Sequence, residues 1–192
     1  MQILYITGND YKFRVAQESV KKSGITLVQQ KLETPEIQSD SVQAIAEFSA
    51  RWACERLQRP VAVTDAGYYI AALNGFPGPF IKYMNHWLTA NDYLRLMDGK
   101  KDRSVIVKTC LVYCKPGDEP VTFIREAKGL IAEQAGPKGE TSINELFIPE
   151  GFQDVASALP ETTMTKFWSQ TESHWQELAT YLASSKNIRG DL

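Results

Sequence analysis

The sequence lacks the features that mark a membrane or secreted protein. No apolar run approaches the roughly 18 residues that a transmembrane helix needs. The first residues, MQILYITGND, contain neither a positively charged leader nor an apolar segment of signal-peptide length. We therefore expect a cytoplasmic protein with no membrane partner.

Cysteine, histidine and net charge are also scarce. The 192 residues include only two histidines and three cysteines, Cys54, Cys110 and Cys114. An odd number of cysteines in a chain of this size argues against a disulfide framework. Cys110 and Cys114 would lie about 13 Å apart on one strand, too far to share a metal ion. We expect reduced thiols that are buried or half-buried.

The charge and composition indicate an ordinary globular protein. The formal net charge is −2, which argues against a broad nucleic-acid-binding face, because such a face is normally basic. Hydrophobic residues make up 43% of the chain and charged residues 23%. At this length we expect a single domain over residues 1–192, with a core large enough for two lobes.

Apolar runs and helical periodicity alternate early in the chain, and a strand-rich hairpin follows. This order predicts an α/β fold with a mixed sheet. A strand at 68–73 is expected to bend back at Gly67, residues 134–170 are expected to be mainly loop, and the tail after Ser184 is expected to fray. The remaining predictions are strands at 3–6, 25–30, 61–64, 104–114 and 121–133, and helices at 10–22, 41–57, 80–87, 91–97 and 172–183.

A glycine lies between the first strand and the first helix, in the run Thr7-Gly8-Asn9 that precedes Lys12. Backbone N–H groups at such a junction can close on an anion. Lys12 can reach back to the same anion as a point charge. The same residues also suit a plain capped helix with a solvated lysine, and the spacing of a Walker P-loop is absent. The motif alone leaves both interpretations open.

The stretch from residue 64 to residue 84 contains an acid, a loop rich in glycine and proline, and a lysine. Asp65 follows an apolar strand, and the loop at 74–79 leads to Lys82. Glu36 lies in an earlier loop between a strand and a helix. Mg²⁺ binds carboxylate oxygens together with substrate phosphates, so Asp65 and Glu36 are candidate ligands. Periodicity does not show that they meet, and either acid alone suits a solvated position.

Neither histidine belongs to a recognisable catalytic arrangement. His86 lies between Asn85 and Trp87, and His174 follows Ser173 near the last helix. An isolated histidine in such a position is more often a packed or surface residue than a catalyst. No Ser-His-Asp or Cys-His spacing stands out.

The run ALNGFPGPFIK at residues 72–82 is the most specific signal in the chain. It matches almost letter for letter a loop of the inosine triphosphate pyrophosphatase family, and the motif from Thr7 to Lys12 resembles that family's opening phosphate motif. Glu36 and Asp65 fall where the family has its metal-binding acids. Members of the family hydrolyse noncanonical purine nucleoside triphosphates, such as ITP and XTP, to the monophosphate and pyrophosphate.

The resemblance continues through nearly the whole chain. Residues 147–151 are similar to the family's F-x-P-x-G segment, and residues 173–174 are similar to the start of its S-H-R motif. It implies an elongated, twisted mixed sheet flanked by helices, with two lobes and a central cleft, and it implies a homodimer.

The resemblance also implies a Mg²⁺-dependent nucleoside triphosphate pyrophosphatase. The roles it assigns are catalysis by Asp65 and Lys12; metal binding by Glu36 and Asp65; phosphate binding by Thr7, Gly8, Asn9, Lys12 and Lys82; and base binding by Asn144, Ser173, His174 and Trp175.

Several positions depart from the family pattern. Thr64 replaces an acid, Trp175 replaces an arginine, and Ser169-Gln170 replaces a lysine-asparagine pair. The other changes are Val15 for a glutamate, Ser49 for a lysine, and Ile143-Asn144-Glu145 for an aromatic residue followed by Asp-Pro. Each lost charge-assisted hydrogen bond is worth about 1.5–3 kcal/mol. We expect Trp175 to stack on a base instead. Three functions stay open: this pyrophosphatase, an enzyme moved to another nucleotide or pyrophosphate-containing substrate, and a non-catalytic nucleotide sensor or interaction protein.

Overall fold

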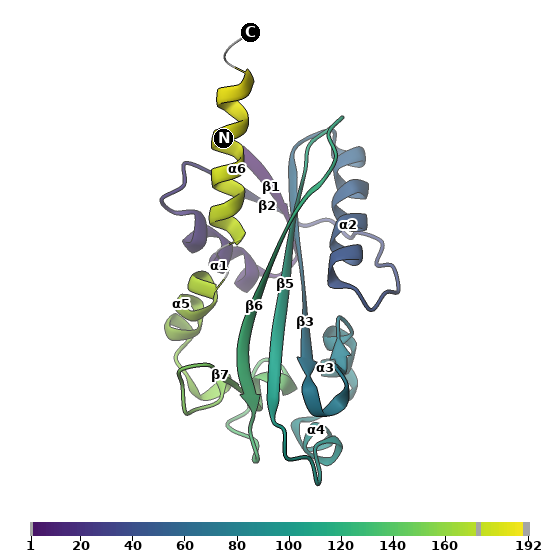
Figure 1. The fold of residues 1–192 in the computed structure, drawn as a ribbon, viewed down its shortest axis with the longest axis vertical. Helices are drawn as coiled ribbons and strands as arrows, with labels where there is room; N and C mark the ends of the chain where they lie inside the picture. Colours follow the sequence, from purple (N-terminus) through teal and green to yellow (C-terminus); the bar gives the residue numbers. More distant parts are fainter. Residues whose placement is uncertain (1, 172–173, 190–192) are drawn as a thin grey trace.

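A long, twisted mixed sheet forms the centre of the protein in a computed structural model, which describes residues 2–171 and 174–189 (Figure 1). The strand order is β2-β1-β3-β5-β6-β7, and β4 pairs with β3. The strands are β1 (Gln2–Ile6), β2 (Thr26–Gln30), β3 (Val61–Ile70), β4 (Pro77–Gly78), β5 (Ser104–Cys114), β6 (Val121–Ile131) and β7 (Phe147–Pro149).

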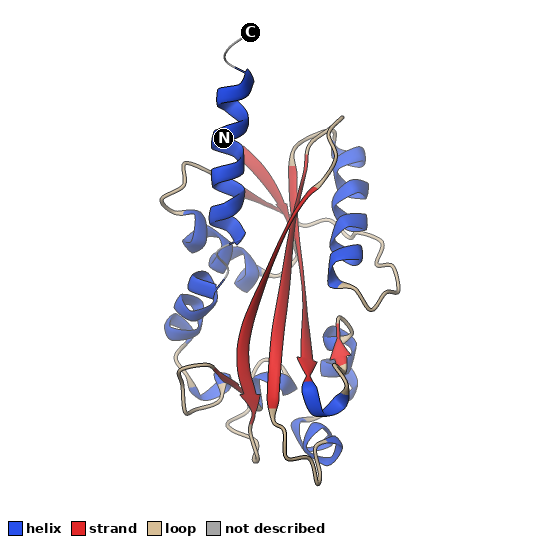
Figure 2. Ribbon diagram, viewed as in Figure 1, coloured by secondary structure: helices blue, strands red, loops and turns tan. Residues whose placement is uncertain are grey.

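Helices lie along both sides of this sheet (Figure 2). The α-helices are α1 (Asp10–Val20), α2 (Val42–Leu57), α3 (Ile81–Trp87), α4 (Ala90–Leu96), α5 (Glu161–Thr171) and α6 (His174–Arg189), and the short 3-10 helices are η1 (Ala71–Leu73), η2 (Ser142–Glu145) and η3 (Ala156–Ala158). The predicted α/β class with a mixed sheet flanked by helices is confirmed.

Strand direction explains where the sheet can hold a site. β1 is parallel to β2 and β3, whereas β3, β5 and β6 are antiparallel. Ile6 pairs with Val63, so the loop that leaves β1 emerges beside the middle of β3. The carboxyl ends of parallel strands are a common place for ligand sites in such sheets.

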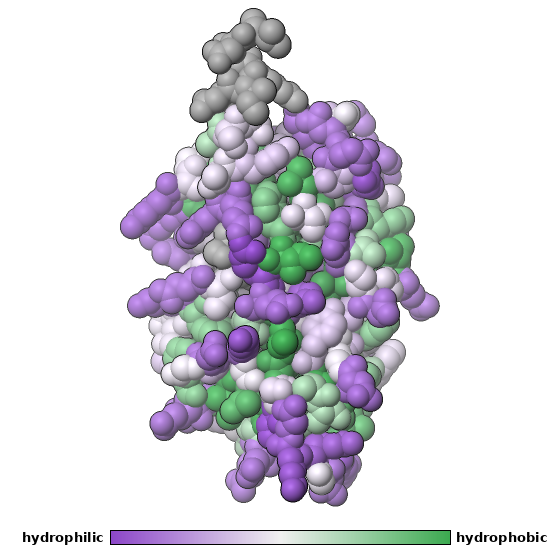
Figure 3. Space-filling view, in the orientation of Figure 1, coloured by the Kyte–Doolittle hydropathy of each residue, from purple (hydrophilic) through white to green (hydrophobic). Residues whose placement is uncertain are grey.

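The core is divided among three clusters. Alternating side chains of β1 face opposite ways, so Leu4 packs with α2 on one side of the sheet and Ile3 packs with α1 and α6 on the other. The third cluster lies at the end of the sheet where β7 is, and it includes residues of α4, β7 and α5. Figure 3 shows hydrophilic residues around the rim of the viewed face, with hydrophobic residues between them down the middle.

The structure corrects the expected bend at Gly67, because β3 runs unbroken from Val61 to Ile70. Gly67 instead allows β4 to approach closely. A Cβ atom there would lie 2.8 Å from the backbone carbon of Gly78. The glycine reflects a close backbone approach and not a turn.

Residues 134–170 contain more structure than expected, since α5 occupies Glu161–Thr171. Its sequence, ETTMTKFWSQT, is rich in threonine, which has modest helix propensity. Tertiary packing outweighs that preference: Met164, Phe167 and Trp168 join the third core cluster. The last helix also continues to Arg189, beyond the expected fraying point, and residues 172–173 of its predicted span lie outside the described residues.

All three cysteines are buried, as predicted, and none of them forms a disulfide within the described residues. Across the described ranges, no helix is both long and apolar enough to cross a membrane.

Candidate phosphate and metal site

An open cleft of about 1870 Å³ lies where the loop after β1 meets β3 and α3. This volume exceeds the roughly 300–1,000 Å³ of ordinary ligand pockets, so an extended ligand can lie along it. Its lining comes mainly from residues 6–15, 31–38, 45–49, 63–68, 76–87, 138–144 and 156–168.

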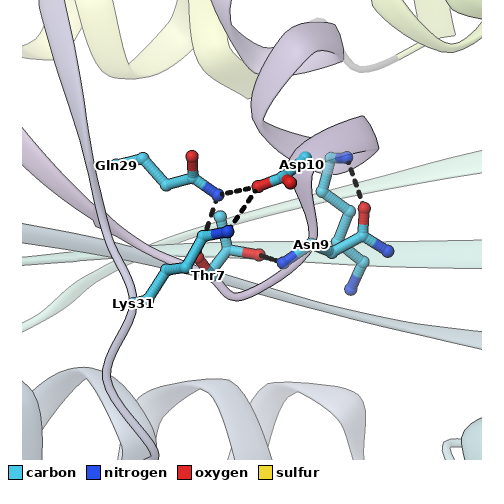
Figure 4. A network of polar contacts seen from close by, with 6 residues as sticks. Thr7, Asn9, Asp10, Gln29 and Lys31 are labelled. Carbon is cyan, nitrogen blue, oxygen red and sulfur yellow. Dashed lines mark hydrogen bonds and ion pairs between the residues drawn. The ribbon is translucent and has the colours of Figure 1, made fainter.

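The loop between β1 and α1 is held in place by its own side chains (Figure 4). Asn9 caps α1, its Oδ1 accepting a hydrogen bond of 2.9 Å from the Lys12 N–H. Thr7 Oγ1 accepts a bond of 3.1 Å from the Asn9 N–H. A Cβ atom at Gly8 would meet no atom within 4 Å, so there is open space beside this glycine. The capped helix is confirmed, and its N-terminus faces the cleft.

A second set of contacts anchors this loop to β2. Gln29 donates from Nε2 to Asp10 at 2.8 Å and to the Thr7 carbonyl oxygen at 3.3 Å. Lys31 pairs with the same Asp10 carboxylate at 3.0 Å. The bonds from Gln29 and then Lys31 lower the pKa of Asp10. The acid nearest the helix N-terminus is therefore already partnered by a cation.

Asp65 lies on β3 just beyond the Ile6–Val63 pair, so it faces the start of the loop after β1. Burial is the main cause that raises the pKa of its carboxyl group. The charges of Lys12 and Lys82 lower that pKa, and the charge of Glu36 raises it. All four charged groups come from separate parts of the chain and line the same cleft.

Glu36 joins the loop before α2 to the start of α3. Its Oε1 accepts a hydrogen bond of 2.7 Å from Lys82 Nζ, and its Oε2 accepts one of 3.0 Å from the Tyr83 hydroxyl. The bond from Lys82 is the largest cause that lowers the pKa of Glu36, and the same contact raises the pKa of Lys82. Glu36 and Asp65 therefore line the same cleft, which periodicity did not establish.

The two carboxylates suit a cation that arrives together with phosphate. The described residues contain no group of three or more acidic, histidine or cysteine side chains that would enclose a metal by themselves. Mg²⁺ usually takes one or two carboxylates and completes its shell with waters and substrate phosphates. Glu36 and Asp65 match that donor set, and Lys82 would have to release one oxygen of Glu36.

Two departures from the family pattern lie beside this site. Thr64 Oγ1 shares a hydrogen bond of 2.5 Å with the buried Tyr5 hydroxyl. Ser49 is buried on α2 and lines the cleft. An uncharged hydroxyl thus stands at each of these positions, where the family has an acid and a lysine.

The structure corrects two of the expected base contacts. Trp175 and His174 are both 0% exposed and do not line the cleft. Trp175 packs edge-on against Tyr5, with ring centroids 5.0 Å apart, in the core between α6 and the sheet. Its ring cannot stack on a bound base there, because the first turn of α6 is turned into the core. Ser173 lies outside the described residues.

Asn144 does line the cleft, and it has neighbours that the sequence did not indicate. Asn85 Oδ1 accepts hydrogen bonds from the Ser142 hydroxyl at 3.1 Å and from the Ile143 N–H at 3.2 Å, tying α3 to η2. Trp168 lines the same end from α5. The spacing of Met164, Phe167 and Trp168, three and four residues apart, is the one sequence signal that could have indicated this helix and its apolar face.

A model of the Ham1 family matches residues 3–176. The chain belongs to the Ham1 family. This match confirms the resemblance to inosine triphosphate pyrophosphatases.

Relatives in the Ham1 family cover most of the chain. The sequence is 40% identical over 153 residues to a protein of Methanopyrus kandleri named dITP/XTP pyrophosphatase, covering 79% of this chain and 80% of that one. It is 32% identical over 184 residues to a protein of the same name from Pyrobaculum aerophilum, covering 96% and 97%.

Solved structures share the fold. A HAM1 protein from Coxiella burnetii superposes with a TM-score of 0.77 at 22% identity, covering 96% of this chain and 99% of that one. A nucleoside-triphosphatase / dITP/XTP pyrophosphatase from Mycobacterium abscessus has a TM-score of 0.69 at 21% identity, covering 90% and 95%. Both support the Ham1 architecture described above.

Proposed function

We propose that this Ham1-family chain is a nucleoside triphosphate pyrophosphatase that releases pyrophosphate from noncanonical purine nucleotides with the help of Mg²⁺. The observation that carries the proposal is that Lys12, Glu36, Asp65 and Lys82 line one cleft with the capped N-terminus of α1, and that Lys82 bonds to Glu36 at 2.7 Å. The relatives named dITP/XTP pyrophosphatase make dITP and XTP the first substrates to test.

The triphosphate would be held by the first loop and two lysines. The N-terminus of α1 carries a partial positive charge and backbone N–H groups, and the open space at Gly8 lets an anion approach them. Lys12 and Lys82 add full positive charges. Catalysis of this kind depends mainly on positioning and on stabilising negative charge.

Asp65 would act on the attacking water. Its carboxylate lines the cleft from β3 and can accept a proton from a water bound there. The water oxygen bonds to the α-phosphorus, the bond from that phosphorus to the bridging oxygen breaks, and the water proton passes to Asp65. Bound Mg²⁺, held by Glu36 and Asp65, would neutralise charge on the phosphates.

We propose that residues 1–192 act as one domain in a cytoplasmic homodimer. We propose no nucleic-acid or membrane partner, in keeping with the net charge of −2.

A pyrophosphate-release assay tests the proposed function. Purified protein with Mg²⁺ is given dITP, ITP, XTP, dUTP, ATP and GTP, and the Asp65→Asn variant is the control. Release from the noncanonical purines, and its loss in the variant, is the expected result. Well-folded protein that releases no pyrophosphate from any of them would contradict the proposal.

A nucleotide sensor on the same fold is the second candidate. The uncharged hydroxyls of Thr64 and Ser49 at positions where the family has charged groups favour it. A thermal-shift titration separates the two functions, because a sensor would bind nucleotide without turnover and Asp65→Asn would leave that binding unchanged.

A further inference from the structure

The end of the cleft formed by η2, η3 and α5 differs chemically from the end that holds the lysines. Its half-buried or buried lining includes aromatic and aliphatic side chains, among them Tyr68, Ile143, Met164 and Trp168. Lys12 and Lys82 line the same cleft from α1 and α3. A nucleotide has one anionic end and one flat aromatic end, so the two parts match the two ends of such a ligand.

Trp168 is supported from beneath by the core. Its ring stacks on Phe147 with centroids 5.9 Å apart and an interplanar angle of 14°, and Phe147 is fully buried. Phe167 meets the same indole edge-on at 4.9 Å. Trp168 is half-buried and lines the cleft, so the ring surface that neither Phe147 nor Phe167 covers is the part available to a ligand.

Ser157 supplies a hydroxyl to the lining of the same cleft. Its Oγ is buried and has no hydrogen-bond partner within the described part of the chain, yet the residue lines the cleft. A buried hydroxyl without a partner is costly, and a ligand group that bonds to it would recover that cost. Ala156, the residue before it, belongs to the same core cluster as Trp168.

A glycine brings Ser157 together with Asn144. A Cβ atom at Gly139 would lie 2.9 Å from the Cβ of Ser157 and 3.3 Å from the Cβ of Asn144. No side chain larger than hydrogen fits between them without movement. The Asn144 amide carries both donors and an acceptor, and the Ser157 hydroxyl can donate or accept. Together they can satisfy the polar edge of a base.

We propose that Trp168 and Ser157 determine base binding: the purine stacks on the open surface of Trp168, and Ser157, with Asn144, bonds to its polar edge. This inference rests on the proposed function, since it assigns the base-contacting residues of the same site. It assigns the stacking role to α5, in place of the buried Trp175.

The test measures binding of IMP and of inorganic pyrophosphate, which are the products of the proposed reaction and are not consumed by it. IMP carries a base, whereas pyrophosphate carries none. Calorimetric titrations compare the wild type with Trp168→Leu, Trp168→Phe and Ser157→Ala. Trp52→Phe is the matched control, because Trp52 lies on α2, packs against a different core cluster and does not line the cleft.

We expect Trp168→Leu to weaken IMP binding about tenfold or more while pyrophosphate binding stays within about twofold. Trp168→Phe should fall between the wild type and Trp168→Leu, because it keeps a smaller aromatic ring. Ser157→Ala should weaken IMP binding about fivefold. Trp52→Phe should change neither ligand. Thermal melting of each variant establishes that a loss of IMP binding does not reflect unfolding.

Equal losses of IMP and pyrophosphate binding in folded Trp168→Leu would overturn the inference, as would unchanged IMP binding or a wild type that does not bind IMP. The outcome is independent of turnover. A protein that releases no pyrophosphate but loses IMP binding specifically in Trp168→Leu would sink the proposed reaction and leave the base site supported.

Discussion

The two ends of the cleft are assembled in different ways. At the phosphate end, short local motifs supply Lys12, Glu36, Asp65 and Lys82 to one cleft, and an ion pair joins Lys82 to Glu36. At the base end, by contrast, side chains are placed by packing, with Trp168 lying on the buried Phe147 ring.

This difference shows which functional residues can be predicted from a short sequence motif. The motifs at the phosphate end lie in the first 82 residues, where Lys12, Glu36, Asp65 and Lys82 keep the family's residue types and order although Ser49 and Thr64 beside them do not. The base end depends on η2, η3 and α5 meeting in space, so substitutions there change the site without breaking a short motif. Family resemblance therefore transfers better to the phosphates than to the base.

The largest expected effect comes from Asp65→Asn at the phosphate end. The amide keeps the shape of the carboxyl group but cannot accept the proton of the attacking water. The rate of pyrophosphate release from dITP should fall about 10²–10⁴-fold. The thermal midpoint should stay close to that of the wild type. A variant that keeps a tenth of the activity or more would remove Asp65 from the proposed chemistry.

Lys82→Met should have the next largest effect. It removes a positive charge near the phosphates and frees Glu36 Oε1 from its 2.7 Å bond. The KM for dITP should rise about 10–100-fold, as expected for loss of one charge-assisted hydrogen bond. Tyr83→Phe removes the weaker 3.0 Å partner of Glu36 and should have a smaller effect. Equal effects of the two changes would contradict the assigned role of Lys82.

The same variant gives a pH-dependent prediction for Glu36. Lys82 is the main cause that lowers the pKa of Glu36, so in Lys82→Met that pKa should move up toward its ordinary value. In the wild type, the stabilising contact is present above the unfolded pKa and is lost as pH falls through the lower folded pKa. Because both side chains are exposed, the effect on stability should stay below about 1 kcal/mol. NMR titration of the Glu36 carboxyl carbon measures the shift, and an unchanged pKa would contradict it.

A pair of glycine substitutions compares the packing at the two ends. Gly139→Ala would place a Cβ atom 2.9 Å from that of Ser157, so unfolding free energy should fall by about 1–3 kcal/mol. Gly8→Ala meets no atom within 4 Å and should change it by less than about 0.5 kcal/mol. Urea denaturation measures both. Similar losses would show that the phosphate loop is packed as tightly as the base end.

The smallest effect concerns two buried thiols, Cys110 on β5 and Cys54 on α2. Cys110 pairs across the sheet with Asp65, and burial raises the pKa of its thiol to about 12. Burial also raises the pKa of Cys54 to about 12. In folded protein at pH 8 neither thiol should react with a chromogenic disulfide reagent within minutes, and all three cysteines should react in denaturant. Fast reaction of Cys110 in folded protein would mean that the sheet opens there.

Much of the fold and of the phosphate end was predictable because the signals are local. Asn9 caps α1 where the residue pattern placed it, and Ile6 and Asp65 lie at the ends of apolar strand segments. The loop at residues 72–82 identified the family. That Glu36 and Asp65 line the same cleft required the three-dimensional structure, since Glu36 lies in the loop before α2 and Asp65 lies on β3.

The base end was not predictable, because long-range packing decides it. The threonine-rich sequence of α5 does not favour a helix, and Trp168 reaches the cleft only because that helix packs on Phe147. Trp175 has the residue type for stacking but is covered by Tyr5 and α6. Neither outcome follows from a motif. Gly67 was interpreted as a bend for the same reason, because the close approach of Gly78 to it is a tertiary contact that the sequence around Gly67 does not indicate.

The most direct test of the central claim identifies which bond the protein breaks. Phosphorus NMR follows ITP with Mg²⁺ and the wild-type protein in water enriched in oxygen-18. The proposed chemistry predicts IMP and pyrophosphate as products, with the heavy oxygen in IMP, because water attacks the α-phosphorus. Formation of IDP and phosphate, or label in pyrophosphate, would contradict it.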